Sequence, residues 1–513
     1  MIKNDNIVQS SHSPKGGEGG GLKSLAKDTA IYGLSSILGR FLNYLLVPLY
    51  THYMPKESGD YGVSTNIYAY TALILVLLTF GMETTLFRFA NERPSPQSLP
   101  RNGEGAWADT VFSTGFALIA SLTVVFLALV FGFITPIADS LGYAEHHNYL
   151  LMMAAVVAMD ALQALPFSYL RFQKRPIRFA TLKMLFIALN IGLNVLFFVV
   201  LHKTSVFYVF LLNLACTGVI SLLFLPQLFK IQWHFDWILL RRMISYSWPI
   251  LILGVAGILN QVADKIIFPL VYPDEADAQV QLGIYGSCVK IAMIMAMITQ
   301  AFRYAYEPIV FAGVKDKDQH QMYTQAMKYF VIFTLLAFLL VIAYLDILKH
   351  LVVRQPEYWV GLKVVPIVMA AEIMMGVYFN LSFWYKLIDK TIWGAVFSGI
   401  GCTVLLAVNI LFVPRYGYMA CAWGGFAGYG VAMVASYVVG QKYYPLNYPV
   451  REIAKYVLLA LLLTGTMLWA RREVSLWMSV LLNTALVGIF LTYIVRRDFP
   501  LSGLPVIGKY FKK

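Results

Sequence analysis

Fourteen long apolar runs follow one another along the chain, and this repetition constrains the fold more than any other feature. A helix of about 20 apolar residues spans the hydrocarbon core of a bilayer, and it satisfies its backbone hydrogen bonds internally. We therefore predict an all-α polytopic membrane protein with about 14 transmembrane helices. The predicted spans are residues 28–50, 62–86, 108–134, 148–170, 178–201, 205–229, 245–271, 281–308, 325–347, 362–386, 391–413, 417–440, 452–470 and 474–495.

Other fold classes fit the sequence poorly. Strands of a membrane barrel alternate apolar and polar residues, whereas runs such as TALILVLLTF (71–80) do not. Only 13% of the residues are charged, about half the share of a soluble domain. Cys216, Cys288, Cys402 and Cys421 lie in apolar runs without metal-ligand spacing, so we interpret them as buried packing residues.

Basic residues are distributed unevenly between the predicted loops. If the N-terminus is cytoplasmic, the loops on its side carry 27 Lys and Arg residues and the opposite loops carry 8. Because cytoplasmic loops of membrane proteins are enriched in Lys and Arg, we predict that both termini are cytoplasmic. The same bias accounts for the net charge of +13 without nucleic acid as a partner.

The spans divide into two six-helix lobes and a C-terminal pair. The linker KIQWHFDWILLRR (230–242) combines aromatic and basic residues, which is typical of an amphipathic helix in the membrane interface. The predicted segments are a disordered cytoplasmic tail (1–23), an N-lobe (24–229), an interfacial linker helix (230–244), a C-lobe (245–440), a helix pair (441–497) and a basic cytoplasmic tail (498–513).

Three ordered matches indicate that the lobes are repeats of each other. VPLY (47–50) matches FPLVY (268–272), Tyr61-Gly62 matches Tyr285-Gly286, and NVLF (194–197) matches NILF (409–412). Each offset covers six spans, so the two copies have the same orientation and the repeat is parallel. Because transporters place their substrate site at such a repeat interface, we predict a central cavity between the lobes.

A polar stripe runs along the first span. Arg40 lies near its middle, with Ser36 one turn before it and Asn43 one turn after it. A charge at this depth costs about 2.5–3.5 kcal/mol on insertion scales, and it normally faces a bundle interior or a water-filled cavity. We interpret Arg40 as a cavity residue, with a structural ion pair to another helix as the alternative.

The repeat places a matching stripe on the seventh span. Gly257, Gln261 and Asp264 have the same spacing as the stripe on the first span. Lys265 follows Asp264 about 100° around the helix, so we expect the two side chains not to face each other. At least one of them then needs a partner elsewhere.

Further cations lie within the spans. Lys290 and Arg303 add to Arg40 and Lys265, and fixed cations at this depth favour an anionic substrate, because Arg binds phosphate bidentately and Lys acts as a point charge. Arg303 can instead pair with Glu307, one turn later. The predicted substrate-binding residues are Ser36, Arg40, Asn43, Gln261, Asp264, Lys265, Lys290 and Arg303.

Carboxylates near and within the spans suggest gating or ion coupling. Glu83 lies near the cytoplasmic end of the second span with Arg88 beyond it, and the repeat aligns Glu83 with Glu307. Asp160 and Glu372 lie in mid-span, either as proton sites or as carboxyls held neutral by hydrogen bonds. We predict gating or ion-coupling roles for these five residues.

Motifs for enzyme chemistry are missing from the sequence. It has no P-loop, no HExxH and no nucleophile elbow. We therefore predict no enzymatic activity, no built-in ATPase, no cofactor and no metal site. The Gly-rich run WGGFAGYG (423–430) is interpreted as a close helix-packing surface.

Residues 24–95 resemble a known family. SSILGRFLNYLLVPLYTHYMPKESGDYG (35–62) and FGMETTLFRFANE (80–92) are similar to the start of Wzx-type oligosaccharide (polysaccharide-export) flippases. Those proteins carry an Arg in the first helix, a Pro-Leu-Tyr-Thr-like helix end and a Tyr-Gly that opens the second helix. They belong to the MOP superfamily, together with lipid II flippases and MATE drug exporters.

The resemblance implies a function. It implies two lobes in a V around a central cavity, and translocation of an undecaprenyl-diphosphate-linked oligosaccharide across the bacterial inner membrane by alternating access. It implies Arg40 as a diphosphate contact, and the spans 452–470 and 474–495 as a lipid-facing groove. Membrane lipids and the polysaccharide polymerase machinery are expected partners of a monomeric chain. The alternatives are a MATE-like ion-coupled drug exporter, whose cavity would be acidic and aromatic, a lipid II flippase, and a membrane polysaccharide polymerase or ligase.

Overall fold

The computed structural model describes residues 44–92, 104–312, 319–388 and 390–498. All regular secondary structure in these ranges is helical, and thirteen of the described helices are long and apolar enough to span a membrane. The predicted all-α polytopic fold is therefore confirmed for this part of the chain. Most of the first predicted span, 28–50, lies outside the described residues.

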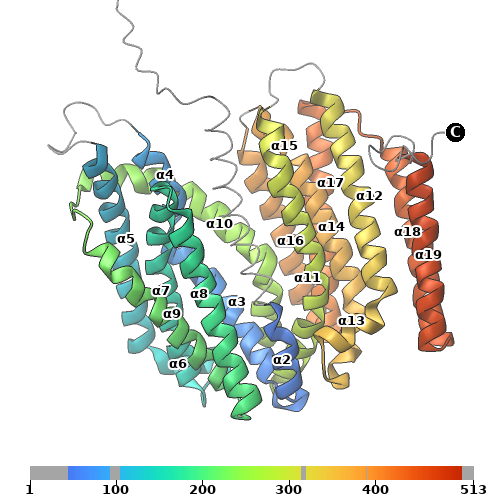
Figure 1. Cartoon of the computed structure of the whole chain (residues 1–513), viewed down its shortest axis with the longest axis horizontal. Coiled ribbons are helices and arrows are strands. Elements are labelled where there is room, and N and C mark those ends of the chain that lie inside the picture. Colours follow the sequence, from blue (N-terminus) through green and yellow to red (C-terminus); the bar gives the residue numbers. More distant parts are fainter. Residues whose placement is uncertain (1–43, 93–103, 313–318, 389, 499–513) are drawn as a thin grey trace, which may run out of the picture.

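Helices α2 to α9 form one group, which we call the N-half (Figure 1). Its elements are α2 (Leu46–Tyr53), η1 (Lys56–Ser58), α3 (Asp60–Thr79), α4 (Met82–Ala90), α5 (Glu104–Gly132), α6 (Ile134–Ser140), α7 (His147–Phe172), α8 (Pro176–Val195), η2 (Leu196–Val200) and α9 (Val206–Leu228).

Helices α10 to α17 form the C-half, and α18 and α19 pack as a hairpin at its edge, against α12 (Figure 1). These elements are α10 (Trp237–Val271), α11 (Glu275–Ala312), α12 (Gln319–Ala343), α13 (Leu345–Val352), η3 (Pro356–Val364), α14 (Val365–Leu381), α15 (Phe383–Leu387), α16 (Ile392–Tyr416), α17 (Tyr418–Tyr443), α18 (Val450–Glu473) and α19 (Leu476–Arg497).

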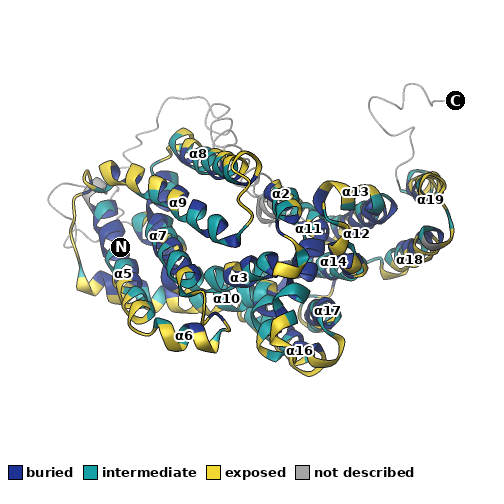
Figure 2. Ribbon diagram, turned by 90° about the horizontal axis from the view of Figure 1, so that it is seen from below, coloured by how far each residue is buried: buried dark blue, intermediate teal, exposed yellow. Residues whose placement is uncertain are grey.

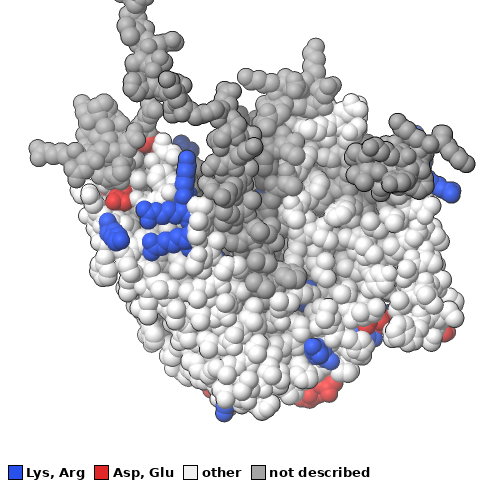
Figure 3. Space-filling model, in the orientation of Figure 1, with Lys and Arg blue, Asp and Glu red and all other residues white. Residues whose placement is uncertain are grey.

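The two ends of the molecule are named here after α4 and α13. In Figure 1 the described helices of the two halves converge at the α13 end and diverge toward the α4 end. Figure 2, seen from below, shows exposed residues on the outward faces and buried residues between the helices. On the face in Figure 3, most charged side chains lie toward the two ends and leave an uncharged band between them. This is the surface expected of a protein surrounded by lipid.

The second predicted span, 62–86, is broken in two. Phe80 and Gly81 both have positive φ angles, of 50° and 68°, so α3 ends and α4 begins with a change of direction. An ideal Cβ on Gly81 would lie 3.1 Å from the Ile250 side chain of α10. The break therefore seats α4 closely against the first part of α10.

The predicted separate linker helix at 230–244 is wrong. Residues 232–236 are not helical, and Trp237 begins α10, which continues without a break to Val271. The Asp236 carboxylate accepts a hydrogen bond from the Leu239 backbone N–H at 3.0 Å and caps the helix. Because this cap lies immediately before the span, the helical pattern of 237–244 joins the span instead of forming a helix of its own.

Helix α10 belongs to the C-half and also packs against helices of the N-half. Near its start, Tyr246 packs against Phe89 and under the guanidinium of Arg88 on α4. Farther along, Asn260 donates to the Ser398 carbonyl of α16 at 3.2 Å, and its own carbonyl accepts from the Tyr429 hydroxyl of α17 at 2.9 Å. Figure 1 shows α10 running obliquely between the two groups.

Glycines bring α16 and α17 together. A Cβ on Gly428 would lie 2.7 Å from the Gly401 carbonyl oxygen, and one on Gly424 would lie 2.6 Å from the Asn409 side chain. The packing interpretation of the run 423–430 is confirmed at these two positions. The four cysteines are also buried and free, as expected.

Candidate functional site

A cavity of about 510 Å³ lies between the halves. The N-half contributes α2, α3, α8 and α9 to its wall, and the C-half contributes α10, α11, α14, α16 and α17. Its polar and ionisable lining residues are Tyr50, Tyr61, Ser64, Thr65, Tyr68, Asn190, Asn213, Asn260, Gln261, Asp264, Lys265, Tyr285, Lys290, Glu372, Cys421 and Tyr429. The cavity brings together four of the predicted binding residues and one of the predicted coupling residues.

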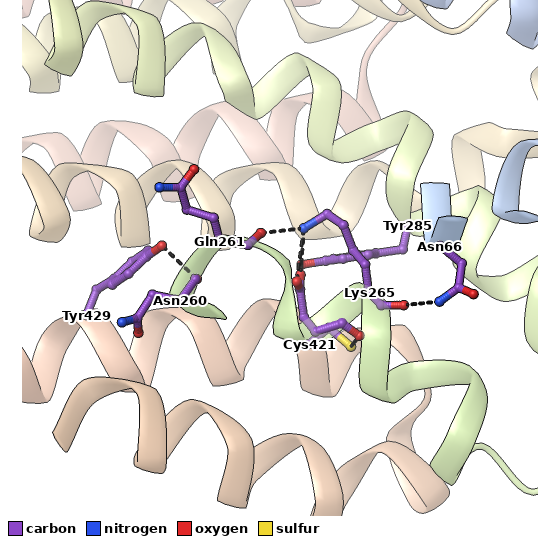
Figure 4. Close-up of polar contacts among 8 residues, drawn as sticks. Asn66, Asn260, Gln261, Lys265, Tyr285, Cys421 and Tyr429 are labelled. Atoms are coloured by element: carbon purple, nitrogen blue, oxygen red, sulfur yellow. Dashed lines mark hydrogen bonds and ion pairs between the residues drawn. The ribbon is translucent and has the colours of Figure 1, made fainter. Parts of the chain in front are cut away.

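Asp264 and Lys265 form an ion pair in the cavity wall (Figure 4). Lys265 Nζ lies 2.9 Å from Asp264 Oδ1 and donates to the Gln261 carbonyl at 3.0 Å. The Tyr285 hydroxyl of α11 donates to Asp264 Oδ2 at 2.7 Å. These bonds connect α10 to α11 and keep a buried carboxylate paired.

The expectation that Asp264 and Lys265 do not face each other is wrong. The two Cα–Cβ bonds do diverge, but the four-carbon Lys side chain is long enough to curve back to the preceding carboxylate. Pairing is favoured because an unpaired charge in a buried site is costly. Neither residue needs a distant ionic partner.

Lys290 and Glu372 also line the cavity. Lys290 belongs to α11 and Glu372 to α14. Among the described residues, neither side chain makes a hydrogen bond or a close ion pair, although both lie near enough to Lys265 for its charge to act on them. An ammonium group held in this way is an attachment point for an anion, and a carboxyl group is one for a cation or a proton.

The predicted excess of cations in the site is not seen among the described residues. Lys265 and Lys290 are balanced by Asp264 and Glu372, so the described wall is formally neutral. Arg303 does not line the cavity: its guanidinium lies over the Phe379 ring, 4.8 Å from the centroid. The described residues also contain no group of three or more His, Cys, Asp or Glu side chains suited to a metal ion.

Most of the predicted gating or coupling residues with described side chains lie outside the cavity. Glu83 accepts from Ser168 at 3.0 Å and pairs with Arg171 at 3.2 Å, which joins α4 to α7 within the N-half. Arg88 stacks on Tyr246, as described for α10. Of the four predicted residues whose side chains the structure describes, Glu372 alone lines the cavity.

Asp160 lies within the N-half, on α7, close enough to Lys183 of α8 for their charges to interact. The side chain of Glu307 lies outside the described residues, so its predicted pairing with Arg303 stays untested. Ser36, Arg40 and Asn43 also lie outside the described residues, and their cavity role stays a prediction.

Sequence reasoning missed the polar residues of the N-half wall. Asn213 of α9 donates to the Tyr68 hydroxyl of α3 at 3.0 Å, and the Tyr50 hydroxyl of α2 donates to Asn194 of α8 at 2.8 Å. Asn194 in turn donates to Asn190 Oδ1 at 3.0 Å. The available signal was the placing of uncharged amides inside apolar runs, but apart from charges the prediction included only the residues of the two polar stripes, Ser36, Asn43 and Gln261.

Contacts that join the halves at the α13 end were also missed. Asn66 of α3 donates to the Lys265 carbonyl of α10 at 2.7 Å, and Tyr143 donates to Asn66 Oδ1 at 2.7 Å. Gln279 of α11 donates to the Tyr143 hydroxyl at 3.3 Å. A Cβ on Gly62 would lie 1.8 Å from the Gln279 carbonyl oxygen, so glycine is required where α3 crosses α11.

The residues from α2 to η1 add a second set of inter-half contacts at the same end. The bonds are Thr51 Oγ1 to the Val352 carbonyl (3.2 Å), the Arg354 N–H to Thr51 Oγ1 (3.2 Å), Gln355 Nε2 to the His52 carbonyl (3.0 Å) and the Tyr358 hydroxyl to the Met54 carbonyl (3.2 Å). With the bonds from Asn66 and Gln279, six described hydrogen bonds cross between the halves here. We call them the α13-end bonds.

Charge clusters hold the α18–α19 hairpin at both ends. At the α4 end, Lys328 of α12 pairs with Glu452 at 2.5 Å and also with Asp498, which accepts from Tyr456. These contacts fix the hairpin to α12.

At the α13 end, Asp346 pairs with Lys349 at 2.6 Å and with Arg471 at 2.8 Å. Burial acts to raise the pKa of the Asp346 carboxyl, but the hydrogen bond from Lys349 and the charge of Arg471 outweigh it, so the pKa lies below its ordinary value of 3.8. We call these three residues the Asp346 cluster.

Comparison with known proteins adds a family and a fold. A family model described as polysaccharide biosynthesis protein matches residues 25–310. No curated protein sequence matches the chain significantly.

Several solved structures with the same fold are a flippase or transporters. The chain is similar to a lipid II flippase, MurJ, in an inward closed conformation, with a TM-score of 0.71 and 14% identity over 91% of this chain and 98% of the other. It is also similar to an inward-facing multidrug resistance MATE family transporter of the MOP superfamily, with a TM-score of 0.61 and 14% identity over 79% and 94%. A mutant of the Vibrio cholerae MATE transporter VcmN gives a TM-score of 0.55 and 16% identity over 82% and 96%.

Proposed function

The chain belongs to the polysaccharide biosynthesis protein family, and from this premise we propose that it is a Wzx-type flippase. In this proposal it moves an undecaprenyl-diphosphate-linked oligosaccharide from the inner to the outer leaflet of the bacterial inner membrane, for cell-surface polysaccharide biosynthesis. It is a multi-pass membrane protein with a transporter fold. The identity of the substrate, the assignment to the bacterial inner membrane and the direction of transport are the parts that we propose.

The observation that carries the proposal is the ammonium group of Lys290 in a cavity between two helical halves, where it has no hydrogen-bonding or ion-pairing partner among the described residues. A buried cation without a protein partner is costly, and such residues mark substrate pathways in membrane proteins. A diphosphate would supply the missing negative charge. Lys265 lies in the same wall, and Arg40 is proposed to add a third cation from the first helix.

The halves are proposed to rearrange about this cavity. With the α13 end toward the periplasm, as the loop charges predict, the α13-end bonds close the outer side. The headgroup would enter between the halves from the cytoplasmic side, while the polyprenyl chain stays in lipid, along the α18–α19 hairpin. Opening of the α13 end then releases the headgroup outward, without any enzymatic step.

The test is an export assay with matched variants. Lys290→Ala and Arg40→Ala are expected to reduce surface glycan at least tenfold at equal protein levels, because each removes a diphosphate contact. Lys442→Ala removes an exposed cation at the end of α17 and serves as the control. Normal export by both cavity variants would contradict the proposal. Mass spectrometry of co-purifying lipids tests the substrate directly, since a polyprenyl diphosphate with its glycan is expected.

A second function, MATE-like export of cationic drugs, is favoured by one observation. Glu372 lines the cavity among aromatic side chains and makes no hydrogen bond or close ion pair with a described residue, although the charge of Lys265 acts on it, and a carboxylate in such a place suits a cation. Drug resistance on expression that is lost in Glu372→Gln and unaffected by polyprenyl lipid supply would support this function over the flippase.

A further inference from the structure

The charged groups of the described cavity lie on one side of it. Asp264, Lys265, Lys290 and Glu372 all belong to the C-half, on α10, α11 and α14. The described N-half lining, from α2, α3, α8 and α9, contains no Asp, Glu, Lys or Arg. The two walls therefore differ in the chemistry that they offer to a bound molecule.

The N-half wall is built from phenols and amides. Tyr50, Tyr68, Asn190 and Asn213 face the cavity from four different helices, and we call them the phenol–amide wall. Phe186 of α8 adds a third ring beside them. Amides are uncommon in helices as apolar as α8 and α9, and polar residues at this depth normally face a bundle interior or a functional cavity.

Internal hydrogen bonds orient this wall but leave part of its capacity free. Because Asn213 donates to the Tyr68 oxygen, the Tyr68 O–H remains able to donate. Asn190 uses Oδ1 to accept from Asn194, and its Nδ2 group makes no hydrogen bond with a described residue. Donors, acceptors and ring faces thus lie together without a charge.

This combination fits the surface of a pyranose. Sugar hydroxyls exchange hydrogen bonds with amides and phenols, and the C–H face of a sugar ring packs on the electron-rich face of an aromatic ring. A diphosphate, in contrast, gains more from the ammonium groups of the opposite wall. The two parts of a lipid-linked oligosaccharide headgroup therefore match the two walls.

We propose that the phenol–amide wall is the glycan subsite of the cavity: it binds the uncharged sugars next to the diphosphate and determines which glycans are accepted. The proposal rests on the flippase function proposed above and deepens it. It makes Tyr68 and Asn213 specificity residues, and it leaves the anion to Lys265, Lys290 and the proposed contact from Arg40.

The test compares two lipids with the purified full-length protein. Native mass spectrometry measures the affinity for bare undecaprenyl diphosphate, and for the lipid-linked oligosaccharide extracted from the expressing cells. The variant is Tyr68→Phe with Asn213→Leu, which removes both partners of one hydrogen bond and keeps the ring. Tyr416→Phe, at a tyrosine that is 55% exposed and does not line the cavity, is the matched control.

The preference is the ratio of the affinity for the glycan-bearing lipid to the affinity for the bare lipid. We expect this ratio to be about tenfold lower in the double variant than in the wild type, which is the effect of one to two hydrogen bonds. Its affinity for the bare lipid should change less than twofold, and its thermal unfolding should match that of the control. An unchanged preference, or an equal loss for both lipids, would overturn the glycan subsite. Failure of the wild-type protein to bind either lipid would instead refute the flippase function.

Discussion

A disulfide between α3 and α11 is expected to hold the α13 end closed and to stop transport. Thr65 of α3 and Gly286 of α11 face each other across the boundary between the halves, and both line the cavity. A Cβ built on Gly286 would lie 3.4 Å from the Thr65 Cβ. Disulfides need a separation of about 3.5–4.5 Å, so the Thr65→Cys and Gly286→Cys pair can form with a shift of a few tenths of an ångström.

The size of the effect follows from the contacts that close this end. Six α13-end bonds at about 0.5–1.5 kcal/mol each sum to roughly 3–9 kcal/mol. Substrate binding energy is sufficient to offset an amount of this size, but it cannot break a covalent bond. Transport should therefore fall in proportion to the cross-linked fraction, with about a tenfold loss at 90% oxidation.

The assay uses cells that carry the cysteine pair in a background with the four native cysteines replaced by Ala. Surface glycan is measured before oxidation, after oxidation and after reduction, and the cross-linked fraction is measured by thiol labelling. The two single-cysteine variants control for the substitutions themselves. Full export by protein that is at least 90% cross-linked would refute the reasoning, because it would show that α3 and α11 need not separate.

Three further predictions concern stability and are checked by thermal unfolding of the purified protein in detergent. Lys265→Ala leaves a buried carboxylate without its partner and is expected to cost about 3–5 kcal/mol; adding Asp264→Asn should recover most of this loss, and no recovery would contradict the ion pair. Gly376→Ala would place a Cβ 2.2 Å from a buried ring of α12 and should cost about 1–3 kcal/mol, whereas Gly399→Ala, with no neighbour within 4 Å, should be neutral. Asp346→Asn should lower the free energy of unfolding by about 1–2 kcal/mol at pH 7. Because the pKa of Asp346 is lowered in the fold, this difference between the variant and the wild type should persist down to about pH 3.8 and vanish as the pH falls further. A difference that grows as the pH falls would contradict the lowered pKa.

Helix number and approximate position were predictable because each apolar run is a local property. The bilayer admits only segments with internal backbone hydrogen bonds, so run length alone predicted the spans after the first to within a few residues at most ends. The main boundary error, at 230–244, came from treating interfacial composition as a separate helix, although Trp237 continues into α10. Local pattern does not decide whether two adjacent helical stretches are joined.

The cavity residues of the C-half were partly predictable. Gln261, Asp264, Lys265 and Lys290 are polar or charged residues in apolar runs, and a membrane strongly penalises such groups outside a bundle interior or cavity. The partners of these residues were not predictable, because the rotamer of a long side chain decides them. Lys265 reaches the neighbouring Asp264, against the expectation from helix geometry.

By itself, the sequence determined that this chain is a multi-spanning helical membrane protein with ionisable groups at mid-membrane depth. The reason is that the hydropathy and charge of each residue follow from its own side chain. Only the tertiary structure decided which of those groups share a cavity: it brought Lys290 and Glu372 to one wall and placed Arg303 on a ring elsewhere. It also created the phenol–amide wall, whose members come from four helices. Such a site depends on how the helices pack, and packing joins residues far apart in the chain that no local pattern connects.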